Sequence, residues 1–262
     1  MTDTFRDYLD FATETAWRAG QLTLGYFQTG VRPDFKPDDS PVTIADRKAE
    51  ELIRRQIEDA FPGHAIVGEE FGADDREGAT HRWYVDPIDG TRAFVRGVPL
   101  YAVLMGLEID GRSEVGVAYF PALGEMLAAA TGAGCRWNGR PARVSSVAAL
   151  KGGIVTHGNA AAFAKHAQGP AWERLQRAAG FCAGWADAYA YLLVATGRAE
   201  VALDPIMSPW DCAPFPPILR EAGGYFGDWE GNETIHASAT MATTQALLPE
   251  VLALIKGENV TG

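Results

Sequence analysis

Residues 86–91 read Asp86-Pro87-Ile88-Asp89-Gly90-Thr91, and this stretch decides the fold class. It directly follows an apolar run, Trp83-Tyr84-Val85. An apolar run that ends abruptly in acidic residues is typical of a buried strand that delivers carboxylates at its carboxyl end, where open α/β sheets place their active sites. The proline fixes the backbone, so that both carboxylates and the intervening Ile88 carbonyl can face one point. Taken alone, the hexapeptide is also explained by a plain turn between a strand and a helix.

The end of the same stretch suits an anion. Gly90 and Thr91 would begin a helix, and the first N–H groups of a helix have no partner within it. Such N–H groups bind anions such as phosphate. The hexapeptide therefore predicts a place where a cation and a phosphate group meet.

Two other acidic clusters point to the same site. Gly68-Glu69-Glu70-Phe71-Gly72 follows the apolar run Ala65-Ile66-Val67, and Trp210-Asp211 lies much later in the chain. Two carboxylates ~4 Å apart repel each other by ~4 kcal/mol at an effective dielectric constant of about 20, so a cation must sit between them. Hard oxygen ligands gathered at strand ends suit Mg²⁺ far better than a soft metal.

The spacing of apolar residues predicts alternating helices and strands. The expected helices are 4–30 with Thr4 as cap, 43–60, 170–179, 187–195 and 249–255. Residues 210–222 also have helical spacing, but three prolines make the first turns irregular. The expected strands are 65–67, 83–85, 103–109, 115–120, 126–130, 154–155, 200–203 and 225–226, with 103–130 as an antiparallel meander.

Composition excludes several classes of protein. The 262 residues include 34 acidic and 23 basic ones, a net charge of −11, so nucleic acid is disfavoured as a partner. With 47% hydrophobic residues the chain can form a core, as one domain or as two intimately packed halves. Three scattered cysteines, no signal-peptide pattern and no run of ~20 apolar residues favour a reduced cytoplasm and no membrane. Serine-hydrolase, zinc-protease, P-loop and dinucleotide-binding motifs do not occur.

Taken together, these motifs resemble the inositol monophosphatase-like phosphatases, which are Mg²⁺-dependent and Li⁺-sensitive. The resemblance rests on residues 39–46 (DSPVTIAD), 68–70, 86–91, 137–139 (WNG), Trp210-Asp211 and 221–224 (EAGG), in family order and spacing. It implies one α+β unit over residues 1–262, a layered αβαβα sandwich. Its halves would be 1–145, with most metal ligands, and 146–262, with Asp211 and the substrate pocket.

The resemblance also implies roles for individual residues. The expected metal ligands are Glu69, Asp86, the Ile88 carbonyl, Asp89 and Asp211. Asp46 and Thr91 would hold and activate the attacking water, and Glu70 would help to hold a third, weaker ion. Without the resemblance, Asp46 would be interpreted as an exposed acid on a helix face. Two or three Mg²⁺ ions per site are expected, with Mn²⁺ as an alternative, in a homodimer.

The physical chemistry of such a site predicts an in-line displacement. Two ions ~3.5–4 Å apart would bridge the phosphate, one lowering the pKa of a water and the other stabilising the leaving alkoxide. No covalent enzyme intermediate is required.

Within the family, the chain looks most like the histidinol-phosphate phosphatases of histidine biosynthesis. The motifs are 68–72, 90–99, 185–189 and 197–205. The departures are Trp185-Ala186-Asp187, where such relatives usually have a glycine before the aspartate, and the proline-rich residues 213–217. The expected substrate contacts are Gly90, Thr91, Arg92, Asp187 and Asp204.

Charge favours the same substrate, because L-histidinol phosphate carries an ammonium and an ionisable imidazole that carboxylates can bind. Asp187 could instead cap a helix, and Asp204 could simply end a strand. Alternative substrates are inositol monophosphate, a broad range of sugar phosphates and 3′-phosphonucleotides. A different hypothesis is a regulatory binding module, which would have no chemical need for the metal ligands.

Overall fold

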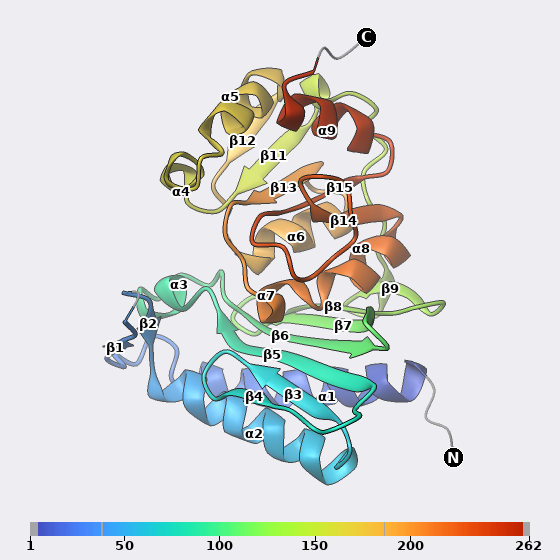
Figure 1. The fold of residues 1–262 in the computed structure, drawn as a ribbon. Helices are drawn as coiled ribbons and strands as arrows, with labels where there is room; N and C mark the ends of the chain where they lie inside the picture. The colour runs from blue at the N-terminus through green and yellow to red at the C-terminus, as the bar shows by residue number, and fades with distance from the viewer. Residues whose placement is uncertain (1–4, 38, 186, 259–262) are drawn as a thin grey trace.

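The computed structural model describes residues 5–37, 39–185 and 187–258, and its elements stack in five layers (Figure 1). Helices α1 (Phe5–Leu24) and α2 (Ile44–Ala60) cover the outer face of a large sheet. Helices between this sheet and a smaller one form the middle layer, and a last helical layer covers the far face of the smaller sheet. This arrangement confirms the expected αβαβα sandwich.

The large sheet has eight strands in the order β10-β9-β8-β7-β6-β5-β3-β4. Their bounds are β3 Ala65–Gly68, β4 Gly72–Asp74, β5 His81–Asp89, β6 Ala102–Ile109, β7 Arg112–Phe120, β8 Glu125–Ala130, β9 Gly134–Trp137 and β10 Arg140–Pro141. The pairs from β5 to β10 are antiparallel, which confirms the meander, whereas β3 and β5 are parallel. The carboxyl ends of β3 and β5 therefore lie at the same edge, and both lead into acidic residues.

The smaller sheet has five strands in the order β12-β11-β13-β15-β14. Its strands are β11 Ile154–His157, β12 Phe181–Ala183, β13 Val201–Asp204, β14 Gly224–Asp228 and β15 Thr240–Thr244. The middle-layer helices are α6 (Ala188–Ala195), α7 (Pro209–Cys212) and α8 (Phe215–Ala222). The far layer contains α4 (Ala160–Lys165), α5 (Gly169–Ala178) and α9 (Leu248–Lys256).

Helix α2 shows how local sequence and packing agree. Thr43 caps it and exchanges hydrogen bonds with Asp46 in a capping box. Ile53 and Ile57 of its apolar stripe are fully buried in the same core cluster as Trp83 of β5. Burial of each such side chain contributes about 1.5–3 kcal/mol, so this face fixes α2 against the sheet.

Several expectations need correction. Helix α1 ends at Leu24, before the expected end at residue 30, and residues 25–30 form turns. The N–H groups of Gly25 and Tyr26 donate to carbonyls three residues back, which is tighter than the four-residue spacing of an α-helix. The expected cap Thr4 lies outside the described residues. The sequence patterns missed α4 and short strands such as β4 and β12, and also β1 (Asp34–Phe35) and β2 (Pro41–Val42), which pair with each other. In the described part of the chain, no helix is long and apolar enough to cross a bilayer.

The proline-rich segment after Asp211 is accommodated by two glycines. Gly106 of β6 and Gly116 of β7 are cross-strand partners, and the α7–α8 junction lies directly on them. A Cβ at position 116 would lie 1.9 Å from the Pro214 carbonyl oxygen. Pro216 and Pro217 cause no break, because they occupy the first turn of α8, where no internal N–H bond is needed.

We expect Gly116→Ala to destabilise the protein by at least about 1–3 kcal/mol, the usual cost of overpacking a core, because backbone must move away from the new methyl group. Urea unfolding measures this loss. Gly63→Ala is the matched control, because a Cβ there meets nothing within 4 Å. Equal midpoints for the two variants would contradict the proposed role of the glycine pair.

Candidate metal centre and catalytic site

Three carboxylates meet where β5 ends. Asp86 and Asp89 lie on β5, whose pairing with β6 is irregular between these two residues, and Asp211 lies on α7. One oxygen of each carboxylate lies within 4.8 Å of an oxygen of the other two. Asp86 is almost completely buried, and the other two are partly buried. The structure thus brings together residues that are up to 125 positions apart in the chain, Asp86 and Asp211.

Each of these carboxylates is oriented by a backbone N–H group. The bonds are Ile88 N–H to Asp86 Oδ1 (2.9 Å), Ala188 N–H to Asp89 Oδ2 (2.7 Å) and Ser208 N–H to Asp211 Oδ2 (2.7 Å). In each case one oxygen is fixed, so the direction of the second oxygen is fixed with it. Outer hydrogen bonds of this kind are what orients the ligands of a metal ion.

The electrostatics of the cluster call for a cation. Burial, followed by the negative charges of Glu69, Asp89 and Asp211, raises the pKa of Asp86 well above its usual range. Burial also raises the pKa of Asp89, with the charges of Asp187 and Asp211 as further causes. The pKa of Asp211 is raised to about 7, mainly by burial. Three oriented, mutually repelling oxygen donors fit a hard divalent cation such as Mg²⁺ or Mn²⁺.

Glu69 and Glu70 lie beside this cluster and share a partner that the sequence patterns did not reveal. Lys36 Nζ lies 2.8 Å from Glu69 Oε1 and 2.8 Å from Glu70 Oε1. Burial is the largest cause of a rise in the pKa of Glu70 to about 7, and the bond to Lys36 opposes it. At the position expected for a third ion, the chain itself therefore supplies one positive charge.

Asp46 of α2 and Thr91, the first residue of α3 (Thr91–Val95), lie together as expected, beside the carbonyl of Ile88 on β5. Thr91 Oγ1 lies 3.0 Å from the Ile88 carbonyl oxygen and 3.4 Å from Asp46 Oδ1. Asp46 Oδ2 accepts hydrogen bonds from the N–H (2.8 Å) and the hydroxyl (2.6 Å) of Thr43. Asp46 is completely buried, so its interpretation as an exposed helix-face acid is wrong. Burial raises its pKa, and the bonds to Thr43 oppose that rise.

A cavity of about 250 Å³ opens beside the carboxylates. Its polar lining includes Asp89, Arg92, Asn159, Asp187, Asp204 and Asp211. Three predicted substrate residues, Arg92, Asp187 and Asp204, therefore share one cavity with two predicted metal ligands. Asn159, the cap of α4, was missed because its helix was missed.

Asp187 and Gly90 face each other at the edge of this cavity. Asp187 occupies the N-cap position of α6, as the capping alternative expects, but its side chain makes no capping hydrogen bond. Its φ of 55° lies in the left-handed region, which is costly for a residue other than glycine and is often found at functional sites. Gly90 has a φ of 82°, and a Cβ there would lie 3.1 Å from Asp187 Oδ2. Ala186, part of one departure noted in the sequence, lies outside the described residues.

Asp204 predicts how the stability of the metal-free protein depends on pH. Burial, with the charge of Asp187, raises the pKa of Asp204 from 3.8 to about 7. The folded state therefore keeps this proton up to about pH 7, whereas the unfolded chain loses it near pH 4. We expect the free energy of unfolding to fall as pH rises from about 4 to 7, by about 2–3 kcal/mol between pH 5 and pH 8 from this group alone.

Urea unfolding in a chelator at pH 5 and pH 8 tests this expectation. The Asp204→Asn variant cannot release the proton, so it should lose less stability over this interval than the wild type. Equal losses in the two proteins would contradict the assignment.

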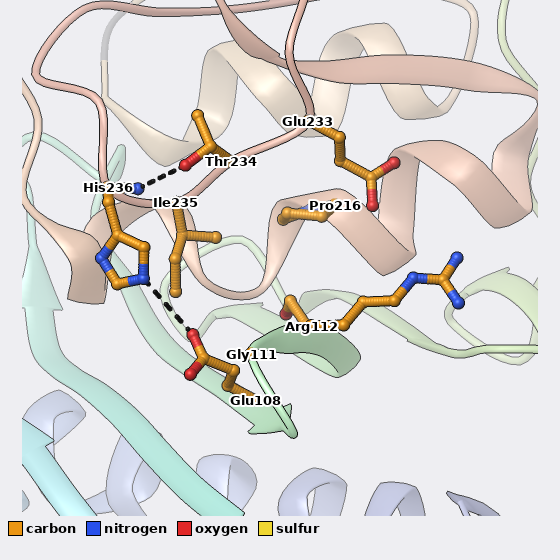
Figure 2. Close-up of a pocket in the computed structure, with 9 residues that line it drawn as sticks. Glu108, Gly111, Arg112, Pro216, Glu233, Thr234, Ile235 and His236 are labelled. Carbon is orange, nitrogen blue, oxygen red and sulfur yellow. Dashed lines mark hydrogen bonds and ion pairs between the residues drawn. The ribbon is translucent and has the colours of Figure 1, made fainter.

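A second cavity, of about 80 Å³, lies at the other end of β5 and β6 (Figure 2). His236 Nε2 lies 3.5 Å from Glu108 Oε2 across it, and Arg112 and Glu233 also line it. Glu108 pairs with Arg82, seven residues before Asp89, which places this cavity roughly 20 Å from the end of the strand. Its acids and bases are already mixed, so it lacks the uncompensated negative charge of the carboxylate cluster.

Comparison with known proteins agrees with this geometry. The model of the inositol monophosphatase family matches residues 5–258. The chain is 46% identical over 228 residues to a histidinol-phosphatase of Chlorobaculum parvum, covering 87% of this chain and 88% of that protein. It is 32% identical over 250 residues to an inositol-1-monophosphatase of Mesorhizobium japonicum, covering 93% and 94%.

Solved structures show the same fold. The inositol monophosphatase from Anabaena matches with a TM-score of 0.85 and 27% identity, over 97% of each chain. The family model spans all the described residues, including every member of the carboxylate cluster. The chain is therefore a phosphatase that belongs to the inositol monophosphatase family.

Proposed function

We propose that this phosphatase hydrolyses L-histidinol phosphate to L-histidinol and phosphate. The observation that carries the proposal is the pair Asp187 and Asp204 in the cavity that also contains Asp89 and Asp211. L-Histidinol phosphate has an ammonium group and an imidazole, and charge-assisted hydrogen bonds to carboxylates are about twice as strong as neutral ones. The similarity to a histidinol-phosphatase at 46% identity supports the same substrate.

Each residue of the site then has a definite task. Asp86, Asp89 and Asp211, with Glu69 and the Ile88 carbonyl, would hold Mg²⁺, with Mn²⁺ as the alternative. When bound, the metal supplies positive charge that neutralises the phosphate and makes a water molecule more acidic. The first N–H groups of α3, at Gly90 and Thr91, would contact the phosphate oxygens.

The proton of the attacking water would pass to the Asp46–Thr91 pair. Thr91 Oγ1 lies between the Ile88 carbonyl and Asp46 Oδ1, so it can orient a water and relay its proton to the Asp46 carboxylate. Burial raises the pKa of Asp46, which makes its carboxylate a better proton acceptor than an ordinary aspartate. Thr43 keeps the Asp46 carboxylate in place through its two hydrogen bonds.

An assay of the purified protein with Mg²⁺ tests the substrate. Histidinol phosphate, inositol monophosphate and 3′-phosphoadenosine 5′-phosphate are compared by kcat/KM. We expect histidinol phosphate to give the highest value. A higher value for either of the other two would overturn the proposal.

Inositol monophosphate is the alternative substrate, and the relative from Mesorhizobium japonicum favours it. Inositol offers only hydroxyl groups, so it gains nothing from two additional carboxylates in the cavity. An enzyme selective for inositol phosphate should therefore tolerate neutral side chains at positions 187 and 204.

A further inference from the structure

A buried carboxylate on α2, one turn after Asp46, contacts the turn that carries Glu69 and Glu70. Glu50 is completely buried. Its Oε2 accepts a hydrogen bond from the Glu70 N–H (2.7 Å), and its Oε1 accepts one from the Phe71 N–H (3.2 Å). The side chain of Glu50 therefore fixes the backbone of the turn, whereas Lys36 Nζ binds the side chains of Glu69 and Glu70.

Arg54, one turn further along α2, completes the contact. Its Nε donates to Glu50 Oε1 at 2.8 Å, and its Nη2 donates to the Gly72 carbonyl. Its guanidinium carbon lies 6.0 Å from the centre of the Phe71 ring. Glu50 and Arg54, here called the positioning pair, thus bind three consecutive backbone groups, the N–H groups of residues 70 and 71 and the carbonyl of residue 72.

The strand before the turn leaves room for this pair. Gly68 of β3 pairs with Gly72 of β4, so residues 69–71 form a three-residue connection between antiparallel strands. A Cβ at position 68 would lie 2.0 Å from Glu50 Oε1. Any larger residue there would have to displace the Glu50 carboxylate.

A buried carboxylate is costly unless it is paired and hydrogen-bonded, and Glu50 is both. Stability alone could be obtained with apolar residues of similar volume, which are often neutral or stabilising replacements for a buried ion pair. A carboxylate that accepts two N–H bonds gives something that apolar packing does not, which is a fixed orientation of the peptide groups on either side of Glu70. Glu69, the preceding residue, has its own N–H bonded to the Val85 carbonyl of β5.

We propose that Glu50 and Arg54 are positioning residues for metal binding: they fix the 69–71 turn so that Glu69 faces Asp86 and Asp211. This inference rests on the proposed role of Glu69 as a metal ligand. It goes beyond that role by naming the residues that hold the ligand in place, and it connects the turn to α2, the helix that also carries Asp46.

Calorimetric titration of the metal-free protein with Mg²⁺ tests the proposal. Glu50→Gln keeps the size of the side chain but loses the charge and one acceptor, and Gly68→Ala displaces the same carboxylate from the strand side. We expect each variant to bind Mg²⁺ about 10–100-fold more weakly, the usual effect of losing an outer partner of a metal ligand. Glu51→Gln, an exposed neighbour on α2, is the matched control and should bind Mg²⁺ as the wild type does.

Circular dichroism melts identify a temperature at which all variants are folded, and the titrations are done there. A purely structural role would lower the melting temperature of Glu50→Gln but leave the titration of the folded protein unchanged, and that result would overturn the proposal. Activity at increasing Mg²⁺ gives a second measurement: a positioning role raises the half-saturating Mg²⁺ concentration of Glu50→Gln and lets kcat recover at high Mg²⁺. If the wild type itself bound no Mg²⁺, the proposed metal role of the site would fail, a result distinct from equal binding by the wild type and Glu50→Gln.

Discussion

The Asp86→Asn variant is expected to lose about 10³-fold in kcat at saturating Mg²⁺. Asparagine keeps an oxygen that can accept the Ile88 N–H bond, so the fold of the β5 end should not change. The substitution removes one of three charged donors that lie within 4.8 Å of one another. A catalytic metal ion supplies several kcal/mol of charge stabilisation in the transition state, and each 1.4 kcal/mol corresponds to a factor of ten in rate.

The same substitution should stabilise the metal-free protein. In the absence of a cation, burial first and then the negative charges of Glu69, Asp89 and Asp211 raise the pKa of Asp86. A neutral side chain removes that repulsion, so in a chelator at pH 8 Asp86→Asn should melt above the wild type. Added Mg²⁺ should raise the melting temperature of the wild type far more than that of the variant. A variant that keeps the activity of the wild type, or that melts well below it in chelator, would contradict the assignment of Asp86.

Asp86→Asn also separates the enzyme from a regulatory binding module. A module would need the fold but no metal, so the variant would still complement a biological defect. Full complementation by an inactive Asp86→Asn protein would show that catalysis is not the main role of the chain. We expect no complementation.

The part of the site that could be predicted from sequence is the part in which neighbouring residues set the geometry. At 86–91, an apolar strand, a proline and a glycine determine the local backbone, and the structure has the strand, the turn and a helix beginning at Thr91. The meander was predicted for the same reason, because its strands alternate with short turns along the chain. Family resemblance, not local pattern, assigned Asp46 to the site.

The remaining features depend on contacts between distant segments. Asp46 is buried because α2 packs against the sheet, which a helical pattern with an acid on one face does not reveal. The bond from the Ala188 N–H to Asp89 joins residues 99 positions apart. Lys36 was missed because a single lysine between Phe35 and Pro37 has no periodic signal. A detectable signal existed in Thr43-x-x-Asp46 and Ser208-x-x-Asp211, since both have the spacing of a capping box, and in the structure both acids accept the N–H of the residue three before them.

Part of the net charge of −11 lies in the proposed site. The proposed site gathers six of the 34 acids, Asp46, Glu69, Glu70, Asp86, Asp89 and Asp211. Burial raises the pKa of five of them. Without metal, these acids therefore either keep their protons or repel one another, and bound divalent ions would displace the protons and offset the repulsion. A phosphate group, which the bare carboxylates would repel, can then enter the site.

Replacing Asp204 with asparagine should separate recognition of the substrate from the chemistry at its phosphate. Asp204 lines the cavity beyond Asp89 and Asp211, and the amide oxygen of the new side chain can still accept the Ile206 N–H bond that Asp204 Oδ1 accepts at 3.4 Å. A hydrogen bond to a charged group is worth about 1.5–3 kcal/mol, so kcat/KM for histidinol phosphate should fall about 10–100-fold. Inositol monophosphate has no cationic group to lose this bond, and its kcat/KM should change less than about threefold, within the ~0.5 kcal/mol typical of neutral surface changes.

In the wild type, kcat/KM for histidinol phosphate should also depend on pH through Asp204, whereas in Asp204→Asn it should not. Because the pKa of unliganded Asp204 is raised to about 7, a cationic substrate finds this group increasingly ionised, and binds it better, as pH rises through 7. Asp204→Asn removes this dependence. Asp59, an exposed acid at the end of α2, provides the control. Asp59→Asn should change neither the ratio of kcat/KM for histidinol phosphate to that for inositol monophosphate nor the pH profile of this ratio. If Asp204→Asn lowers kcat/KM equally for both substrates, Asp204 supports the metal site and does not bind the cationic group of histidinol phosphate. If it lowers neither, the cavity does not select a cationic phosphate ester through this residue.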